Sequence, residues 1–145
     1  MKLILKSEFG SKVYGTTMPD SDTDYKAIAL PSREDILLQK AFKTNQQNTK
    51  KGSETKNTKD DIDYEVISLH YFMRLLAEGN TPAVDLFFTP KAHHVEMDKD
   101  LYWIWETLHE NKDKLISSQV KSFIGYCQTQ AAKYGLKGSN VAAFR

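Results

Sequence analysis

Residues 10–30 read GSKVYGTTMPDSDTDYKAIAL and give the clearest indication of how this chain folds. The run from Asp24 to Leu30 predicts a strand that stops before Pro31, because proline lacks the N–H group that a sheet ladder needs. Asp22 and Asp24 stand two residues apart at its start. Side chains two residues apart on a strand point to the same face, so the two carboxylates are expected to lie side by side.

The carboxylate pair and the Gly-Ser turn before it suit a nucleotide–metal complex. Two neighbouring carboxylates repel each other unless a cation lies between them, and magnesium takes one or two carboxylates together with phosphate oxygens and water. Gly10 lets the backbone approach a phosphate closely. Ser11 adds a hydroxyl donor, Lys12 adds a positive charge, and Ser21 is a fourth candidate for phosphate binding.

A third carboxylate is expected on a neighbouring strand, which the sequence predicts over Ile62–Ile67. Asp63 and Glu65 share one face of that strand, so either could reach the metal ions. In a two-metal scheme, one ion activates the attacking hydroxyl and the other neutralises the triphosphate and the leaving group. Asp63 is the first candidate to hold the activating ion and accept the proton, with Glu65 as its substitute.

Strands come first along the chain and helices last, and this order favours an α+β layer structure. The other expected elements are a strand at Leu3–Ser7, a short helix from Ser32 to Lys40, an amphipathic helix that begins at Ser68 and ends at Gly79-Asn80, a helical turn from Pro82 to Phe88, a helix from about Asp98 to Leu115, and a helix from Ser117 or Ser118 to Tyr134, ended by Gly135.

The segment from Lys43 to Asp60 is almost wholly polar and predicts a mobile loop. It contains no apolar residue that could offset the entropy lost on ordering. Its lysines could contact a polynucleotide acceptor, but acidic neighbours dilute their charge and a solvated linker is the favoured interpretation. The lysines concerned are Lys50, Lys51, Lys56 and Lys59.

The two adjacent histidines and the single cysteine are further candidates for a functional site. His93 and His94, with Glu96 and Asp98, could suggest a metal site, but adjacent side chains on a strand point opposite ways. A surface role is therefore favoured for the two histidines. Cys127 is predicted to be a small buried apolar residue.

Four aromatic residues are candidates for base stacking. Trp103 and Trp105 are two apart on an expected helix, so they cannot share a face, and one of them is expected in the core. Tyr14 and Tyr25 flank the proposed site, where packing is favoured over stacking on a nucleobase.

Composition fits one ordinary cytoplasmic domain. The chain has 145 residues, of which 40% are hydrophobic and 27% charged, and its formal net charge of +1 gives no global attraction to nucleic acid or acidic membranes. The single cysteine cannot form an internal disulfide, which favours a reducing compartment. The apolar run at the N-terminus is too short for a signal peptide or a membrane span.

The combination of Gly10-Ser11, Asp22-x-Asp24 and an acidic third strand resembles the DNA polymerase β nucleotidyltransferase superfamily. The string GSKVYGTTMPDSDTDYKAI resembles one branch, the RNA-repair polymerase-β-like predicted nucleotidyltransferases of bacteria and phages. The resemblance covers roughly residues 3–90. It also includes Ser68-Leu69 with Phe72, Leu75 and Leu76, and the turn Glu78–Pro82 with Leu86–Phe88.

This resemblance implies a small mixed sheet with helices on one side and a C-terminal helical segment. It also implies two divalent ions (Mg²⁺, with Mn²⁺ as an alternative), an NTP substrate, phosphate binding by Ser11, and metal binding by Asp22, Asp24 and Asp63. Lys12 stands where the branch often has arginine, so the charge is kept but the bidentate fork is lost.

The expected organisation is a nucleotidyltransferase core at 1–90, which includes the mobile loop 43–60, and a helical extension of the same domain at 91–145. Its end at Arg145 suggests a truncation, a split gene or a swapped partner. The expected activity is transfer of NMP from an NTP to an acceptor hydroxyl, with an RNA or tRNA end favoured and pyrophosphate released. Alternatives are a protein AMP transferase, a non-catalytic nucleotide- or partner-binding module, and a structural domain with an accidental Asp-x-Asp. A homo-oligomer or a missing C-terminal segment is the expected partner, and no membrane is expected.

Overall fold

The computed structural model describes residues 1–19, 21–48, 61–117 and 121–134. Within these ranges, five strands form one mixed sheet in the order β3-β4-β2-β1-β5. The β2–β4 pair is parallel and the other neighbours are antiparallel. The strands are β1 (Lys2–Phe9), β2 (Thr23–Leu30), β3 (Thr44–Asn48), β4 (Ile62–Ser68) and β5 (His94–Met97). The predicted α+β class with a mixed sheet is therefore confirmed.

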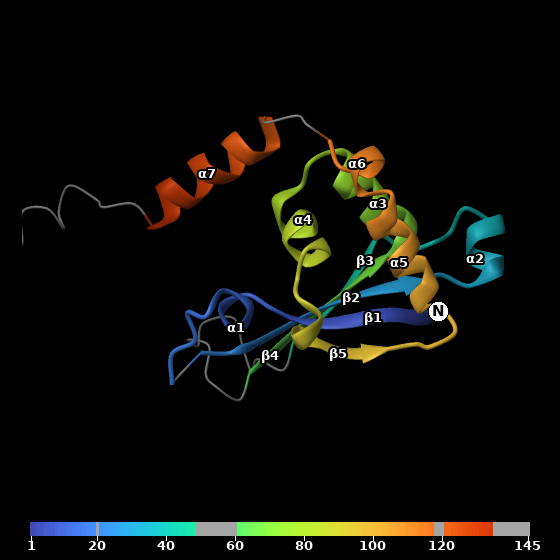
Figure 1. Cartoon of the computed structure of the whole chain (residues 1–145), viewed down its shortest axis with the longest axis horizontal. Coiled ribbons are helices and arrows are strands. Elements are labelled where there is room, and N and C mark those ends of the chain that lie inside the picture. Colours follow the sequence, from blue (N-terminus) through green and yellow to red (C-terminus); the bar gives the residue numbers. More distant parts are fainter. Residues whose placement is uncertain (20, 49–60, 118–120, 135–145) are drawn as a thin grey trace, which may run out of the picture.

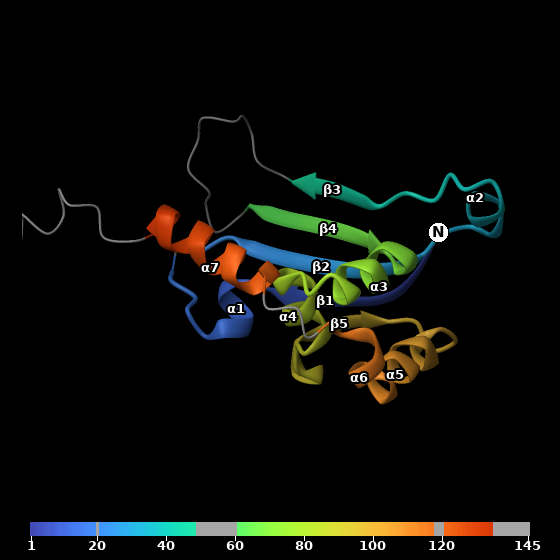
Figure 2. The same cartoon turned by 90° about the horizontal axis from the view of Figure 1, so that it is seen from above.

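Figure 1 shows the main helices above the sheet, and Figure 2 shows α3, α4 and α7 lying over the strands when the sheet is seen from above. The helical elements are α1 (Ser11–Tyr14), α2 (Arg33–Leu37), α3 (Leu69–Ala77), α4 (Thr81–Phe87), the 3₁₀ turn η1 (Lys91–His93), α5 (Tyr102–Glu110), α6 (Lys112–Leu115) and α7 (Lys121–Tyr134). None of the helices within the described ranges has both the length and the apolar character needed to cross a bilayer.

The main core lies between the sheet and these helices. Ile28 of β2 and Ile67 of β4 pack with Phe72, Phe87 and Trp105 from three different helices. Trp105 is 2% exposed whereas Trp103 is 60% exposed, which confirms that the two tryptophans diverge on α5. Because Ile28 and Ile67 face the helices, every second residue along β2 and β4 must face them too.

The opposite face of the sheet carries small buried residues at its centre. Ala27, Ala29 and Val66 are buried there, with Leu3 and Tyr64 packed against them. None of the described helices covers this face in Figure 1.

The prediction of a continuous loop from residue 43 to 60 is wrong for its first part, because Thr44–Asn48 form the edge strand β3. This strand pairs antiparallel with β4, from Thr44 opposite Ile67 to Asn48 opposite Asp63. Backbone pairing alone is enough to hold a polar strand at a sheet edge. Residues 49–60, which include Lys50, Lys51, Lys56 and Lys59, lie outside the described residues.

Ser68 occupies the N-terminal cap of α3, as predicted, but its side chain does not cap the helix. The Ser68 Oγ instead donates to the carbonyl of Lys43 at 3.3 Å, and the Ser68 N–H donates to the same oxygen at 3.0 Å. Ser68 therefore ties the end of β4 to the chain that enters β3.

The single helix predicted from about residue 98 to 115 is wrong, because the chain forms two helices separated at Asn111. Asn111 leaves the helical region (φ −107°, ψ 19°), and its Nδ2 donates to the carbonyl of Thr107 at 2.9 Å. Asparagine side chains compete in this way with the regular helix ladder. Cys127 is exposed on α7 rather than buried, which corrects a second prediction. Ser118, Gly135 and Arg145 lie outside the described residues.

The segment after residue 90, expected to be a helical extension, also contributes to the sheet. The turn η1 leads directly into β5, which pairs antiparallel with β1. Residues Leu5, Lys6 and Ser7 of β1 lie opposite Met97, Glu96 and His94 of β5, respectively. The first and last thirds of the described chain are therefore joined in one sheet.

Candidate functional site

The helix-facing side of β2 and β4 changes from acidic to apolar along the two strands. Parallel pairing sets Asp24 beside Asp63, Lys26 beside Glu65, and Ile28 beside Ile67. Ile28 and Ile67 belong to the core, so alternation places the two charged pairs on the same side of the sheet as the helices. The acidic pair lies at the N-terminal ends of the strands, where the chain arrives from the turn before Asp22.

Three carboxylates meet at this end of the sheet. Each of Asp22, Asp24 and Asp63 offers an oxygen, and these oxygens all lie within 4.8 Å of one another. Asp22 and Asp24 are partly buried. Oxygen ligands at such spacing suit a hard divalent cation. Within the described part of the chain, these three residues form the acidic group that could hold a metal ion.

The pKa of Asp24 is affected by its burial and by the two carboxylates next to it. Burial raises the pKa of its carboxyl group above 3.8, and the negative charges of Asp22 and Asp63 raise the pKa further. Lys26, one step along the same face, acts in the opposite direction. A cation beside Asp24 would therefore favour its ionised form.

Gly10 lies directly against Asp24. Its backbone has φ 64° and ψ −136°, a combination that residues with a side chain rarely adopt. A Cβ built at this position would overlap Asp24 Oδ2. Glycine is therefore required here both by the backbone conformation and by the space that the carboxylate occupies. The Gly-Ser turn predicted to hold phosphate is thus immediately next to the predicted metal ligands.

Ser11 and Ser21, two further candidates for phosphate binding, both lie in the segment between β1 and β2. Ser11 follows Gly10 as the first residue of α1, and its carbonyl accepts from the N–H of Thr16 at 2.9 Å. The Oγ of Ser21 accepts from the N–H of Met18 at 2.9 Å and so closes the turn that leads into Asp22.

Lys12 is not brought to the acidic group. Its Nζ lies 3.2 Å from Glu8 Oε1 and 5.8 Å from the centre of the Tyr25 ring. Tyr25 alternates with Asp24 on β2, and Glu8 is paired with Tyr25 across β1, so these side chains face away from the helices. In this arrangement, the ammonium group of Lys12 lies on the opposite side of the sheet from the carboxylates.

The structure separates the two candidates for the third ligand. Asp63 joins the acidic group, whereas Glu65 makes an ion pair with Lys26 and accepts from Gln46 Nε2 at 3.4 Å. The alternation along β4 could not make this distinction, because both residues face the same way. Lys26 was missed by the sequence reasoning, although its position two residues after Asp24 places it on the same face.

A polar pocket of about 520 Å³ opens beside the acidic group. Asp24 and Asp63 form one end of its lining, and the Lys26–Glu65 ion pair lies further along the same two strands. Phe9 and Gln46 also line it, from β1 and β3 respectively. Its volume is in the range of sites that bind small molecules.

Tyr14 connects the Gly-Ser turn to the helical layer. Its hydroxyl donates to Asp85 Oδ2 of α4 at 2.6 Å. Burial raises the pKa of Tyr14, and the bond to Asp85 raises it further, so the hydroxyl keeps its proton. Tyr14 thus has a structural partner, and Tyr25 packs against Lys6, whose Nζ lies 4.5 Å from its ring centre. Tyr25 therefore has a packing contact, whereas Tyr14 is 55% exposed and is held by its hydroxyl group rather than by packing of its ring.

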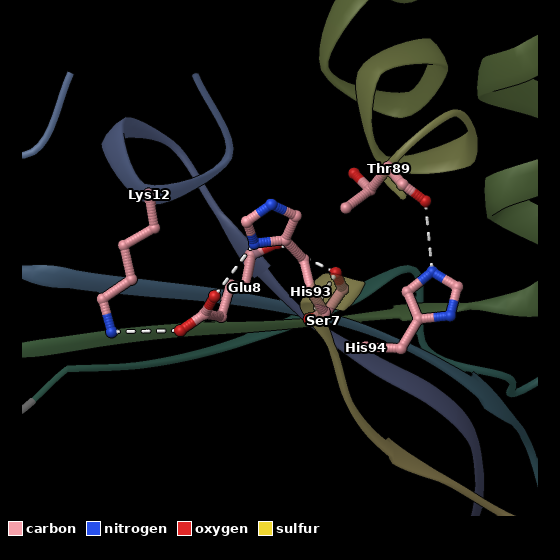
Figure 3. A network of polar contacts seen from close by, with 6 residues as sticks. All are labelled: Ser7, Glu8, Lys12, Thr89, His93 and His94. Atoms are coloured by element: carbon pink, nitrogen blue, oxygen red, sulfur yellow. Dashed lines mark hydrogen bonds and ion pairs between the residues drawn. The ribbon is translucent and has the colours of Figure 1, made fainter. Parts of the chain in front are cut away.

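Glu8 is the centre of a polar network that joins β1, α1 and η1 (Figure 3). Its carboxylate contacts Lys12 at 3.2 Å and His93 Nδ1 at 3.0 Å. The Oγ of Ser7 donates to the carbonyl oxygens of Glu8 and His93. His94 does not contact Glu8; its Nε2 lies 3.2 Å from the carbonyl oxygen of Thr89.

The two histidines lie at the edge of the fold and make specific polar contacts there. His93 and His94 are both partly buried, and each makes a specific contact inside the structure. They point to different neighbours, as expected for adjacent residues. Within the described residues, they do not form a metal-binding group with Glu96 and Asp98.

The Glu8 network predicts a specific acid sensitivity. The hydrogen bond from His93 holds the pKa of Glu8 below 4.5, with a smaller contribution from Lys12. A depressed carboxyl pKa stabilises the fold fully above about pH 4.5, and the stabilisation is lost as pH falls through the folded-state pKa. We expect Glu8→Gln to remove at most about 1 kcal/mol at neutral pH, because the contacts are partly exposed.

Urea unfolding at neutral pH and at about pH 3 checks this expectation. The difference in unfolding free energy between wild type and Glu8→Gln should shrink in acid. The exposed carboxylate of Glu106 on α5 supplies the control, since Glu106→Gln removes a charge outside this network. An equal wild-type–Glu8→Gln difference at both pH values would contradict the assignment.

Comparison with known proteins agrees with this geometry. A sequence model of the RNA repair pathway DNA polymerase beta family matches residues 1–144. The chain is also 42% identical over 145 residues to the uncharacterized 38.9 kDa protein of the nrdC–mobD intergenic region of enterobacteria phage T4. That match covers 100% of this chain and 42% of the phage protein, so the chain spans less than half the length of this relative. No solved structure matches.

Proposed function

Because this chain belongs to the RNA repair pathway DNA polymerase beta family, we propose that it is a metal-dependent nucleotidyltransferase. It would transfer NMP from an NTP to an acceptor hydroxyl and release pyrophosphate. The observation that carries the proposal is the convergence of Asp22, Asp24 and Asp63 within 4.8 Å, directly beside Gly10.

The carboxylates fit a divalent cation by their chemistry. Burial and the two neighbouring charges raise the pKa of Asp24, so its ionised form is disfavoured unless a cation balances its charge. Asp22, Asp24 and Asp63 would hold the ions, and magnesium is favoured because it combines carboxylates with phosphate oxygens. When bound, such ions neutralise the developing charge on the phosphates and lower the pKa of an attacking hydroxyl.

The chain's own groups would position the two reactants. The open backbone at Gly10 and the hydroxyl of Ser11 would hold the NTP phosphates, with Asp24 directly beside them. Asp63 would accept the proton of the acceptor hydroxyl as its oxygen attacks the α-phosphorus. The bond to the β-phosphate then breaks, and pyrophosphate leaves with the electron pair. Most of the acceleration would come from positioning and charge neutralisation.

An RNA end is the favoured acceptor. The family description refers to an RNA repair pathway, and this supports RNA over a protein side chain or a small molecule. Lys12 is engaged by Glu8 in this structure, so triphosphate binding is assigned here to Gly10, Ser11 and the ions.

Calorimetric titration of each of the common NTPs tests the proposal, first with Mg²⁺ and then with EDTA. We expect binding that requires the metal and that is lost in Asp22→Ala. Asp113→Ala serves as the control, because Asp113 is an exposed aspartate on α6. If binding were the same in EDTA, or the same in Asp22→Ala, the metal assignment would be wrong. If no NTP bound, the chain alone would not be a nucleotidyltransferase.

A further inference from the structure

The face of the sheet that is turned away from the helices carries a lysine in contact with two tyrosine rings. Lys6 of β1 lies opposite Ala27, which is buried on this face. Its Nζ is 4.5 Å from the centre of the Tyr25 ring and 4.9 Å from the centre of the Tyr64 ring. Tyr25 and Tyr64 are direct partners in the parallel β2–β4 pair, so one ammonium group contacts two neighbouring rings. Figure 1 shows none of the described helices over this face.

The charge of Lys6 is not balanced by an ion pair within the part of the chain that the structure describes. Lys12, the second lysine near the Tyr25 ring, is paired with Glu8. Glu96 lies opposite Lys6 in the β1–β5 pairing, but its side chain is exposed on an edge strand. The partly buried ammonium group of Lys6 is therefore available to an anion that a ligand supplies.

The surface that this face presents is polar and aromatic rather than apolar. Ala27 and Ala29 are fully buried beneath the neighbouring side chains, and Val66 is only 3% exposed. A helix or a sheet of another protein would therefore gain little burial of apolar area here. A second copy docked by the same face would bring two Lys6 ammonium groups into one interface, where like charges repel.

A single-stranded nucleic acid has the chemistry that complements this surface. A phosphate can bind the ammonium group of Lys6, and the bases on either side of that phosphate can stack on the two rings. Burial and the negative charge of Glu96 raise the pKa of Tyr64, so its hydroxyl group keeps its proton and can donate to a phosphate or a base. A double helix keeps its bases stacked inside and would leave the rings without a partner.

We propose that this face binds a single-stranded segment of the acceptor RNA, with a phosphate at Lys6 and the adjoining bases on Tyr25 and Tyr64; the choice of RNA rests on the proposed nucleotidyl transfer. Tyr25 directly follows Asp24, and Tyr64 directly follows Asp63. The RNA-binding face is therefore a second surface, behind the acidic group on the other side of the same two strands. An RNA anchored there is held close to the proposed metal ions without occupying their site.

The test follows binding of a fluorescent single-stranded RNA of about ten nucleotides by anisotropy, in EDTA and without NTP, over a range of salt concentrations. The main variant is Lys6→Met, which keeps an apolar stem over Ala27 and removes the charge. We expect it to bind RNA several-fold more weakly, and the slope of log affinity against log salt to fall in magnitude by about 0.7, the loss of one phosphate contact. Lys6→Arg should restore most of the affinity, and the same RNA in a duplex should bind more weakly than the single strand.

Three further variants separate charge, stacking and folding. Glu96→Gln should bind RNA more tightly than the wild type, because it removes a negative charge near Lys6 and changes only an exposed side chain. Tyr64→Leu should weaken binding by at least about fivefold, the loss of one stacked base. Lys112→Gln is the matched control, because Lys112 is an exposed lysine of α6 in the helical layer, and its affinity should equal that of the wild type.

Titration of NTP with Mg²⁺ on the wild type and Lys6→Met lets the two proposals fail separately. Absence of metal-dependent NTP binding in the wild type would remove the nucleotidyltransferase assignment, whereas RNA binding in EDTA does not depend on the metal site. The RNA-binding face would be overturned if the wild type bound no RNA, or if Lys6→Met and Glu96→Gln both had the wild-type affinity and salt slope. A single-stranded DNA of the same sequence that bound much more tightly than the RNA would overturn the assignment to the acceptor.

Discussion

Replacement of Asp24 by alanine is expected to slow nucleotidyl transfer by roughly 10²–10³-fold, or about 3–4 kcal/mol of transition-state stabilisation. An oxygen of Asp24 lies within 4.8 Å of oxygens of Asp22 and Asp63, and burial together with their negative charges raises the pKa of Asp24. Without it, the remaining carboxylates could not hold both ions in place. The measurement is pyrophosphate release with NTP, Mg²⁺ and a short RNA acceptor.

The same loss is expected for Asp22→Ala, whereas Glu65→Gln should keep much more of the activity because Glu65 lies outside the acidic group. Near-wild-type turnover in either aspartate variant would rule out the metal assignment. The Asp113→Ala control should release pyrophosphate at the wild-type rate, since it changes net charge equally on the surface of α6.

Replacement of Asp24 by asparagine is expected to raise the stability of the metal-free protein, although it lowers the activity with Mg²⁺. Because the folded-state pKa of Asp24 is raised above 3.8, the folded protein holds this proton more tightly than the unfolded chain does. The metal-free protein then loses stability as pH rises from the unfolded to the folded pKa, and the penalty remains at neutral pH. Asp24→Asn should therefore be more stable than wild type in EDTA, as measured by urea unfolding, while it is less active with Mg²⁺.

Much of the site could be predicted because it depends on strand alternation. The Asp-x-Asp spacing places two carboxylates on one face wherever the strand goes, and the structure brings Asp22 and Asp24 together. The choice between Asp63 and Glu65 needed more than alternation. It depends on the register of β2 and β4, which sets Asp24 beside Asp63 and leaves Lys26 to pair with Glu65. Register between distant strands is a tertiary property that no local pattern records.

The errors share a physical origin. Thr44–Asn48 form an edge strand through backbone hydrogen bonds to β4, although their side chains carry no apolar signal. Lys12 was assigned to phosphate by its place in the chain, but its long side chain finds Glu8 and Tyr25 on the other face. Cys127 is exposed on α7, as are the neighbouring side chains of that helix whose burial the structure describes. Each outcome depends on which partner is nearby, and composition does not specify it.

Gly10→Ala is expected to damage the site more than any change of a neutral residue elsewhere in the turn. The backbone conformation of Gly10 costs a residue with a Cβ about 1–3 kcal/mol. The new methyl group would also overlap Asp24 Oδ2, so Asp24 must rotate away or the turn must shift. A displacement of a reacting group by about 1 Å can reduce a rate by 10²-fold.

The matched control is Gly15→Ala, at the other end of α1. Gly15 also has a positive φ of 67°, but no atom lies within 4 Å of a Cβ built there. Its replacement should cost about 1–2 kcal/mol of stability and leave metal-dependent NTP binding unchanged. Urea unfolding and calorimetry on both variants then separate backbone strain from the steric effect. If Gly10→Ala and Gly15→Ala lost stability equally and both bound NTP like the wild type, the close packing of Gly10 on Asp24 would have no role in the site. If only Gly10→Ala lost NTP binding, the glycine would be required because it leaves room for the metal-binding carboxylate.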